Sequence, residues 1–306
     1  MTEASEAWMD DLEGGCGFGS SNEDVSSTEN VTEEMEKPKK EISILGLPMT
    51  EASEAWMDDV GDGGGFEASE EERQFCLVMR EDSSPLLSEE TAKEQLTQGQ
   101  PLPGEWLWIL DPLDGTKDFL QGTGEYAVHL ALVRGNRPVL GVVLLPEADE
   151  LWIGLVGDGA WCEDREGKRS PVRFSERKEL SDLLLVASRS HRDDRLETLI
   201  GELQLGGSKA VGSVGCKVAT ILRGETDLYI SLSGRSAPKD WDMAAPEAVL
   251  LAAGGRFTHA DLRDLTYNTG DVRQAGCLIA SHGKAHVALG ERATRAMAEI
   301  DPGFQV

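Results

Sequence analysis

From about residue 105 onward, short apolar runs alternate with helix-like segments, and this alternation constrains the fold more than any other feature. Apolar runs bounded by turn residues predict strands, and apolar residues spaced three or four apart predict helices. We expect strands at 106–110 (ending at Asp111), 127–133, 139–145, 151–156, 160–163, 183–187, 228–232 and 277–280, and helices at 193–203, 217–223, 242–253 and 284–300. Helices between mixed sheets indicate an α/β (α+β layered) body, in an αβαβα or α+β arrangement.

The chain has 306 residues, enough for about two domains, and a formal net charge of −27. Such acidity excludes the basic face of a nucleic-acid-binding protein and a polybasic membrane anchor. The longest nearly unbroken apolar stretch, Val139 to Leu145, is far shorter than the ~20 residues of a membrane span. The chain opens without a signal-peptide pattern, and its five scattered cysteines are typical of reduced thiols. We therefore expect a cytoplasmic protein without a nucleic-acid or membrane partner.

Most of the acidity lies in the first third of the chain. Residues 1–100 carry 26 acidic and 6 basic side chains, whereas residues 101–306 carry 30 and 23. Residues 1–70 contain few aliphatic side chains, so we expect disorder over most of this segment. We therefore divide the chain into an acidic arm at 1–75, a metal-binding subdomain at 76–182 and a C-terminal α/β subdomain at 183–306.

The arm contains a repeat: residues 1–11 and residues 49–59 both read MTEASEAWMDD. One interpretation is a recent duplication without a binding role. The other is a pair of apolar anchors, Trp8-Met9 and Trp56-Met57, that bind a protein partner bivalently. The sequence does not name such a partner.

The motif DPLDGT at 111–116 is the sharpest candidate site. Asp111 and Asp114 stand where an apolar strand stops, so both carboxylates can converge on one point. Pro112 stiffens the turn, and Gly115 allows close approach of the backbone to a ligand. Free N–H groups of a helix beginning near Gly115 would bind an anion. Carboxylates beside an anion site favour Mg²⁺; the alternative is an ordinary Asp-rich surface turn.

Two further acidic sites strengthen the metal interpretation. Glu89-Glu90 lies about 20 residues upstream, and Asp242 begins an Ala-rich helical segment. Taken singly, Glu89-Glu90 could be a solvated helix start with Ser88 as its N-cap, and Asp242 could be an N-cap. Their occurrence together with DPLDGT makes these separate explanations improbable.

Glu89-Glu90, WLWILDPLDGTKDF (106–119) and WDMAAPEAVLLAAGG (241–255) together resemble the inositol monophosphatase superfamily of lithium-sensitive, Mg²⁺-dependent phosphomonoesterases. The resemblance covers about residues 83 to 300 and implies an αβαβα sandwich of the sugar-phosphatase type. Within the superfamily, Lys117-Asp118-Phe119, Gly124-Glu125-Tyr126 and SRSH (188–191) resemble the 3′(2′),5′-bisphosphate nucleotidase branch.

The resemblance implies a site with two or three Mg²⁺ ions. Glu89, Asp111 and the Leu113 carbonyl would hold one ion, and Asp111, Asp114 and Asp242 a second. Gly115 and Thr116 would contact the phosphate, and the Thr116 hydroxyl would orient the attacking water. The implied catalytic residues are therefore Thr116, Asp111 and Glu89.

Contacts to the rest of a nucleotide are expected from Ser213, Lys217 and His191, with Arg235 and Lys239 as weaker candidates. Alternatives exist: Lys217 could be a surface lysine, and His191 a plain loop residue. Family members also carry a Lys-x-Asp-x-Ser-Pro-x-Thr-x-Ala-Asp segment between two long helices. Here residues 80–85 resemble its start and then run directly into 86–90, so the Thr-x-Ala-Asp part and the second helix are missing. Glu81 and Asp82 are the candidates to replace the lost water-activating carboxylate.

Three functions follow as expectations. The first is hydrolysis of the 3′-phosphate of 3′-phosphoadenosine 5′-phosphate to AMP and phosphate, by water activated between two metals. The second keeps this chemistry but acts on another small-molecule phosphate ester, inositol monophosphate or a sugar phosphate. The third is a phosphatase-like binding protein with impaired catalysis, supported by the missing segment and the repeated arm.

Overall fold

The computed structural model describes residues 43–44, 47–48, 84–89, 99–189, 193–233 and 237–304. The chain divides into two units, Met1–Arg80 and Glu81–Val306. In the first unit, the described residues form a small antiparallel sheet of β1 (Ser43–Ile44) and β2 (Leu47–Pro48). These four residues lie within the arm for which we expected disorder; the rest of residues 1–70, with both copies of the repeat, lies outside the described residues.

Seven strands of the second unit form one sheet in the order β3-β4-β5-β6-β7-β8-β9. Short turns such as Gly135-Asn136 join sequential strands from β5 onward, so these neighbours pair antiparallel. The strand β3 instead pairs parallel with β4. The bounds are β3 (Leu86–Ser88), β4 (Trp106–Asp114), β5 (Ala127–Arg134), β6 (Arg137–Leu145), β7 (Glu150–Leu155), β8 (Gly159–Glu163) and β9 (Arg169–Pro171).

Five further strands form a mixed sheet in the order β11-β10-β12-β14-β13. Two helices, α4 (Asp194–Leu203) and α5 (Val214–Leu222), provide the crossovers that make β10 parallel to β11 and β12. The bounds are β10 (Leu184–Ser188), β11 (Gly207–Val211), β12 (Leu228–Ser233), β13 (Arg256–His259) and β14 (Gly276–Ser281).

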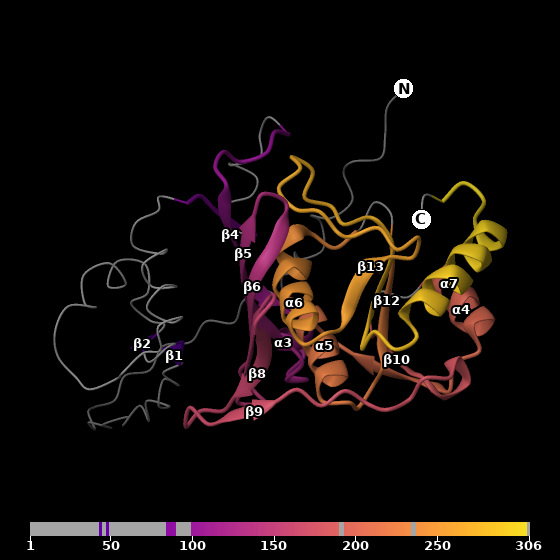
Figure 1. Ribbon diagram of the computed structural model, residues 1–306, viewed down its shortest axis with the longest axis horizontal. Helices are drawn as coiled ribbons and strands as arrows, with labels where there is room; N and C mark the ends of the chain where they lie inside the picture. Colours follow the sequence, from indigo (N-terminus) through magenta and orange to yellow (C-terminus); the bar gives the residue numbers. More distant parts are fainter. Residues whose placement is uncertain are drawn as a thin grey trace, which may run out of the picture. The chain divides into compact units, whose positions relative to one another are not determined.

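The helices complete a layered α/β body, as predicted. Figure 1 shows α5 and α6 (Asp240–Ala252) between the two sheets, with α4 and α7 (His286–Ile300) beyond the five-stranded sheet. Two short helical segments, α3 (Thr116–Leu120) and η2 (Leu180–Asp182), lie in connections. Within the described part of the chain, no helix combines the length and apolar composition needed to cross a bilayer.

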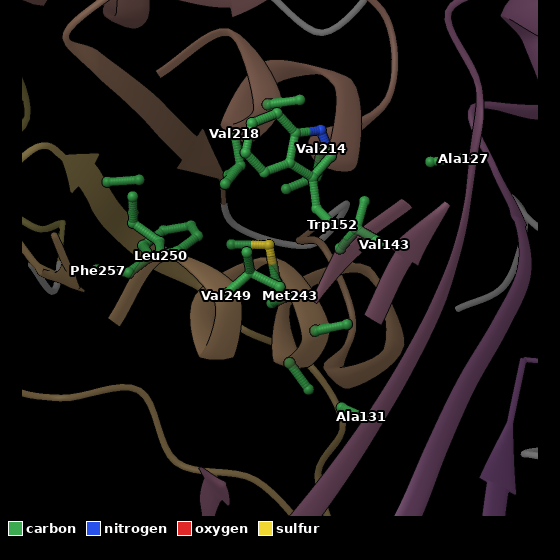
Figure 2. Close-up of a cluster of buried hydrophobic side chains, with 14 of the residues drawn as sticks. Ala127, Ala131, Val143, Trp152, Val214, Val218, Met243, Val249, Leu250 and Phe257 are labelled. Atoms are coloured by element: carbon green, nitrogen blue, oxygen red, sulfur yellow. The ribbon is translucent and has the colours of Figure 1, made fainter. Parts of the chain in front are cut away.

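The central helix α6 lies directly on β6 and β7 because two glycines leave room for it. A Cβ atom added to Gly141 would lie 2.4 Å from the Ala245 carbonyl oxygen, and one added to Gly154 would lie 2.5 Å from Val249 Cα. Figure 2 shows Met243 and Val249 of α6 in the buried cluster between the sheets, near Val143. This close packing determines where the start of α6 stands relative to the sheet.

Several predicted boundaries are wrong, for reasons that depend on tertiary pairing. The strand expected at 106–110 continues to Asp114, and the helices expected to begin at Lys217 and Asp242 begin at Val214 and Asp240. Ser88 is not a helix N-cap but the last residue of β3, where it pairs with Leu110. The helix considered near Gly115 is present as α3, which begins at Thr116. In the described part of the second unit, sequence patterning missed four strands: β3, β9, β11 and β13. Each missed element has five residues or fewer, too short for a periodic signal.

The predicted division into 76–182 and 183–306 remains a prediction. The seven-stranded sheet ends at Pro171 and the five-stranded sheet begins at Leu184. The contacts nevertheless join 81–306 into one compact unit.

Candidate metal centre

The DPLD motif forms a bulge at the end of β4. Asp111 pairs with His129 of β5 and Asp114 pairs with Ala127, so two residues of β4 oppose one of β5. Residues three apart in a regular strand point to opposite faces, and the extra residue of a bulge reverses this alternation. Pro112 fits here because a bulge residue makes no ladder hydrogen bond. The bulge therefore allows both aspartates to face one side.

A third carboxylate comes from α6, more than a hundred residues later in the chain. One carboxylate oxygen from each of Asp111, Asp114 and Asp242 lies within 4.8 Å of the other two. Asp242 is the third residue of α6 rather than its N-cap, and its Oδ2 accepts the Lys239 main-chain N–H at 2.6 Å. The structure thus brings together three of the five predicted metal ligands.

The N-terminus of α5 holds the Asp114 carboxylate. Its Oδ2 accepts the main-chain N–H groups of Val214 at 2.5 Å and Gly215 at 3.3 Å. These two N–H groups lack partners inside the helix, and the helix N-terminus favours a negative charge. Asp114 is therefore oriented by a second element as well as by its own strand.

Burial and mutual repulsion make this cluster costly without a cation. Burial, and then the charges of Asp114 and Asp242, raise the pKa of Asp111 from 3.8 to about 9. Burial, and then the charge of Asp114, raise the pKa of Asp242 from 3.8 to about 7. A bound divalent cation removes this penalty, and oxygen-only donors suit Mg²⁺. The residues present therefore fit a magnesium site.

Glu89 stands at the edge of the cluster. It follows β3, its main-chain N–H donates to the Leu110 carbonyl at 3.2 Å, and it is exposed. Its charge contributes to the raised pKa of both Asp111 and Asp242. Its carboxylate is not in the group within 4.8 Å that the described residues form. Its role as a metal ligand stays a prediction.

The other DPLDGT residues form a compact turn. The Leu113 N–H donates to Asp111 Oδ1 at 2.9 Å, and the Thr116 hydroxyl donates to the Leu113 carbonyl at 3.2 Å. Gly115 has a φ of 89° and caps α3. A Cβ there would lie 3.0 Å from the Glu125 carbonyl oxygen, so a larger residue would be both strained and crowded. Leu113 and Thr116 are thus tied to the residues that carry the carboxylates.

Two of the predicted nucleotide contacts, Ser213 and Lys217, are buried at the beginning of α5. Ser213 is buried and caps α5 by accepting the Cys216 N–H at 2.9 Å. Lys217 is buried as well: its Nζ donates to the Gly212 carbonyl and lies 5.3 Å from the centre of the Tyr229 ring. Burial lowers the pKa of Lys217. The alternative of a surface lysine is therefore wrong, while substrate binding by Lys217 stays a prediction.

Several other candidates lie outside the described residues: Glu81, Asp82, Glu90, His191 and Arg235. Lys239 is described, and its Nζ donates to the Ala237 carbonyl at 2.7 Å. Sequence reasoning missed His129, which faces Asp114 across the strand pair at 3.6 Å. The available signal was one polar residue within the apolar strand 127–133.

The raised pKa values predict how stability depends on pH. Asp111 and Asp242 bind protons more tightly in the folded state than in the unfolded state. The contribution of these two groups to stability is therefore fully present below pH 3.8 and is lost as the pH rises through about 7 for Asp242 and about 9 for Asp111. We expect the unfolding temperature in EDTA to fall between about pH 5 and about pH 9. Saturating Mg²⁺ should flatten this slope because it favours the charged carboxylates. Equal slopes in EDTA and Mg²⁺ would contradict the assignment.

Comparison with known proteins extends these observations. A 3′(2′),5′-bisphosphate nucleotidase CysQ of Escherichia coli strain K12 is 34% identical over 186 residues, which cover 60% of this chain and 70% of that protein. The CysQ of Buchnera aphidicola is 34% identical over 149 residues, which cover 49% and 53%. The chain thus spans between about half and two thirds of the length of several curated relatives that it matches.

Solved structures show the same architecture. An inositol monophosphatase from Anabaena sp. PCC 7120 superposes with a TM-score of 0.55 and 26% sequence identity, over 72% of this chain and 82% of that one. The model of the inositol monophosphatase family matches residues 77–298, which include the bulged strand, the α5 N-terminus and α6. The chain therefore belongs to the inositol monophosphatase family.

Proposed function

We propose that this chain is a Mg²⁺-dependent phosphomonoesterase that hydrolyses the 3′-phosphate of 3′-phosphoadenosine 5′-phosphate to AMP and phosphate. The observation that carries the proposal is the convergence of Asp111, Asp114 and Asp242 within 4.8 Å. The nucleotide substrate is supported by the similarity to CysQ nucleotidases over more than half of the chain. Lys117-Asp118-Phe119, directly after the metal motif, supports the same branch.

The protein's own groups divide the work of hydrolysis. Asp111, Asp114 and Asp242, joined by Glu89 and the Leu113 carbonyl, would hold the cations. Bound divalent cations activate water, neutralise phosphoryl oxygens and stabilise the leaving oxygen. Gly115 and Thr116 would bind the phosphate, and the Thr116 hydroxyl, 3.2 Å from the Leu113 carbonyl, would orient the water. Water adds to phosphorus, the bond to the ribose 3′-oxygen breaks, and that oxygen takes a proton.

Substrate contacts beyond the phosphate belong to the same proposal. Ser213 and Lys217 stand at the first turn of α5, next to the N–H groups that hold Asp114. We assign Ser213, Lys217 and His191 to the nucleotide, with Lys217 contributing its charge from a buried position. Burial lowers the pKa of Lys217, and the nearby charges of Asp114, Asp118 and Asp242 act in the opposite direction and favour the protonated form.

A second candidate is an inositol monophosphatase or a sugar phosphatase. It is favoured by the 26% identity and shared fold with the Anabaena inositol monophosphatase. The metal chemistry would be identical, and the two substrates would differ in the group that Ser213, Lys217 and His191 contact. A third candidate, a phosphatase-like binding protein, follows from the shortened segment before Glu89 and the repeated acidic arm.

One experiment separates the three candidates. Phosphate release is measured from 3′-phosphoadenosine 5′-phosphate and from inositol 1-phosphate, with Mg²⁺ and with or without lithium. We expect lithium-sensitive release from the nucleotide at a much higher kcat/KM. Release from the inositol ester alone would move the assignment to the second candidate. A folded protein that releases phosphate from neither ester would leave the third.

A further inference from the structure

A histidine is buried where the elements of the metal centre meet. His129 lies on β5, opposite Asp111 in the strand pairing, and its side chain is only 1% exposed. Its Nδ1 lies 3.3 Å from the Trp241 carbonyl oxygen, and its Nε2 lies 3.6 Å from Asp114 Oδ2. Trp241 directly precedes Asp242 in α6. One imidazole ring thus spans the gap between Asp114 and the turn of α6 that carries Asp242.

A third element is shaped around the same ring. A Cβ atom added to Gly215 would lie 2.4 Å from His129 Nε2, so the glycine lets the ring reach the N-terminus of α5. Gly215 is also one of the two residues whose N–H groups hold Asp114. His129 therefore contacts β4, α5 and α6 at the points that orient the carboxylates.

The ring nitrogens do not have equivalent partners. The Trp241 carbonyl and the Asp114 carboxylate can only accept hydrogen bonds, and a neutral imidazole carries one N–H. The ring is fully buried, and burial away from water favours the neutral form. A lone pair facing a full negative charge costs more than one facing a carbonyl dipole, because charge-assisted contacts are the stronger ones. The proton therefore belongs on Nε2, toward Asp114.

We propose that His129 is a positioning residue that uses Nε2–H to hold Asp114 at its separation from Asp242, and so sets the affinity of the site for Mg²⁺. The Nε2 atom is buried and has no partner within hydrogen-bond distance in the described part of the chain. An unpaired buried donor is costly, so Nε2–H attracts the Asp114 carboxylate, whose Oδ2 lies 3.6 Å away, and opposes its movement away from the ring. This inference rests on the proposed metal-dependent function and adds a residue that acts through Asp114.

Three variants of His129 test the proposal in the full-length chain. His129→Leu removes both nitrogens, and His129→Asn keeps a donor near the Nδ1 position only. His129→Gln keeps a donor near the Nε2 position. The main readout is the Mg²⁺ concentration that gives half of the maximal rise in unfolding temperature, because a cation that binds only the native state stabilises it. The Mg²⁺ dependence of phosphate release is the second readout.

In the leucine and asparagine variants, we expect the Mg²⁺ midpoint to rise by about tenfold or more. This is the range typical of a lost contact to a metal ligand. The glutamine variant should stay within about threefold of the wild type. Turnover at saturating Mg²⁺ should change little in all three. The matched control is His286→Leu, since His286 is equally buried but bonds to Ser281 and Thr258. It should lower the unfolding temperature without changing the Mg²⁺ midpoint.

The results distinguish a failure of the proposed role of His129 from a failure of the proposed metal-dependent function. Unchanged Mg²⁺ midpoints in the asparagine and leucine variants would overturn the role of His129. Equal losses in the glutamine and leucine variants would overturn the assignment of the proton to Nε2. If the leucine variant does not fold, the comparison of asparagine with glutamine carries the test. A wild type that Mg²⁺ does not stabilise would instead overturn the proposed function itself.

Discussion

Asp114→Asn should reduce turnover by more than about a hundredfold, because even the loss of an outer-shell partner of a metal ligand costs about 10- to 100-fold. The substitution removes one of three clustered carboxylates while preserving the size of the side chain. The amide oxygen can still accept the Val214 and Gly215 N–H groups. The fold should therefore persist, and the loss should fall on metal binding.

Stability separates this effect from misfolding. Losing the charge at the α5 N-terminus costs about 0.3–1 kcal/mol, and relief of repulsion with Asp111 and Asp242 offsets it. We expect an unfolding temperature in EDTA close to that of the wild type, with little or no rise on adding Mg²⁺. Asp149→Asn, at an exposed site paired with Arg165, serves as the control and should keep full turnover. Near-normal turnover of Asp114→Asn would remove the assignment of Asp114 as a ligand.

Gly141→Ala should damage both stability and activity, although Gly141 is not a member of the carboxylate cluster. The new methyl group would lie 2.4 Å from the Ala245 carbonyl oxygen and 2.7 Å from Ala248 Cβ, so α6 must move away from β6. Overpacking of this kind costs about 1–3 kcal/mol. Because α6 carries Asp242, the displacement also opens the carboxylate cluster. We expect a lower unfolding temperature and a higher Mg²⁺ requirement for phosphate release.

The matched control for this prediction is Gly201→Ala in α4. A Cβ atom there meets nothing within 4 Å, and alanine inside a helix is more stable than glycine by about 0.5–1 kcal/mol. This variant should be slightly more stable, with an unchanged Mg²⁺ requirement. If Gly141→Ala behaved like Gly201→Ala, the close packing of α6 against β6 would not be needed to position Asp242.

Local sequence predicted the chemistry of the site better than its shape. The DPLDGT motif and Asp242 were recognisable because their residue types and order are written in short segments. The bulge was not, since a strand ending at Asp111 and a strand bulging at Asp111 have the same composition. Only the pairing of Asp111 with His129 and of Asp114 with Ala127 reveals the extra residue. The short strand β3, which precedes Glu89, likewise depends on its neighbour β4.

The sequence pattern also could not predict which residues surround the carboxylate cluster. Lysine is a residue type that is usually exposed, yet Lys217 is buried because the first turn of α5 faces inward. His129 has the position of a core residue in an alternating strand, yet it faces Asp114. Both outcomes depend on where α5 and α6 pack between the sheets, which a local pattern of three to four residues does not encode.

The sequence by itself determined the layered α/β class, the family and three of the carboxylates, because hydrophobic periodicity and motif residues are local properties. Tertiary structure alone decided how those carboxylates meet. Asp114 is oriented by N–H groups a hundred residues away, and Asp242 is placed by glycines on strands of the facing sheet. Such contacts arise from close packing of distant segments, which determines distances of a few ångströms only once the whole core has formed.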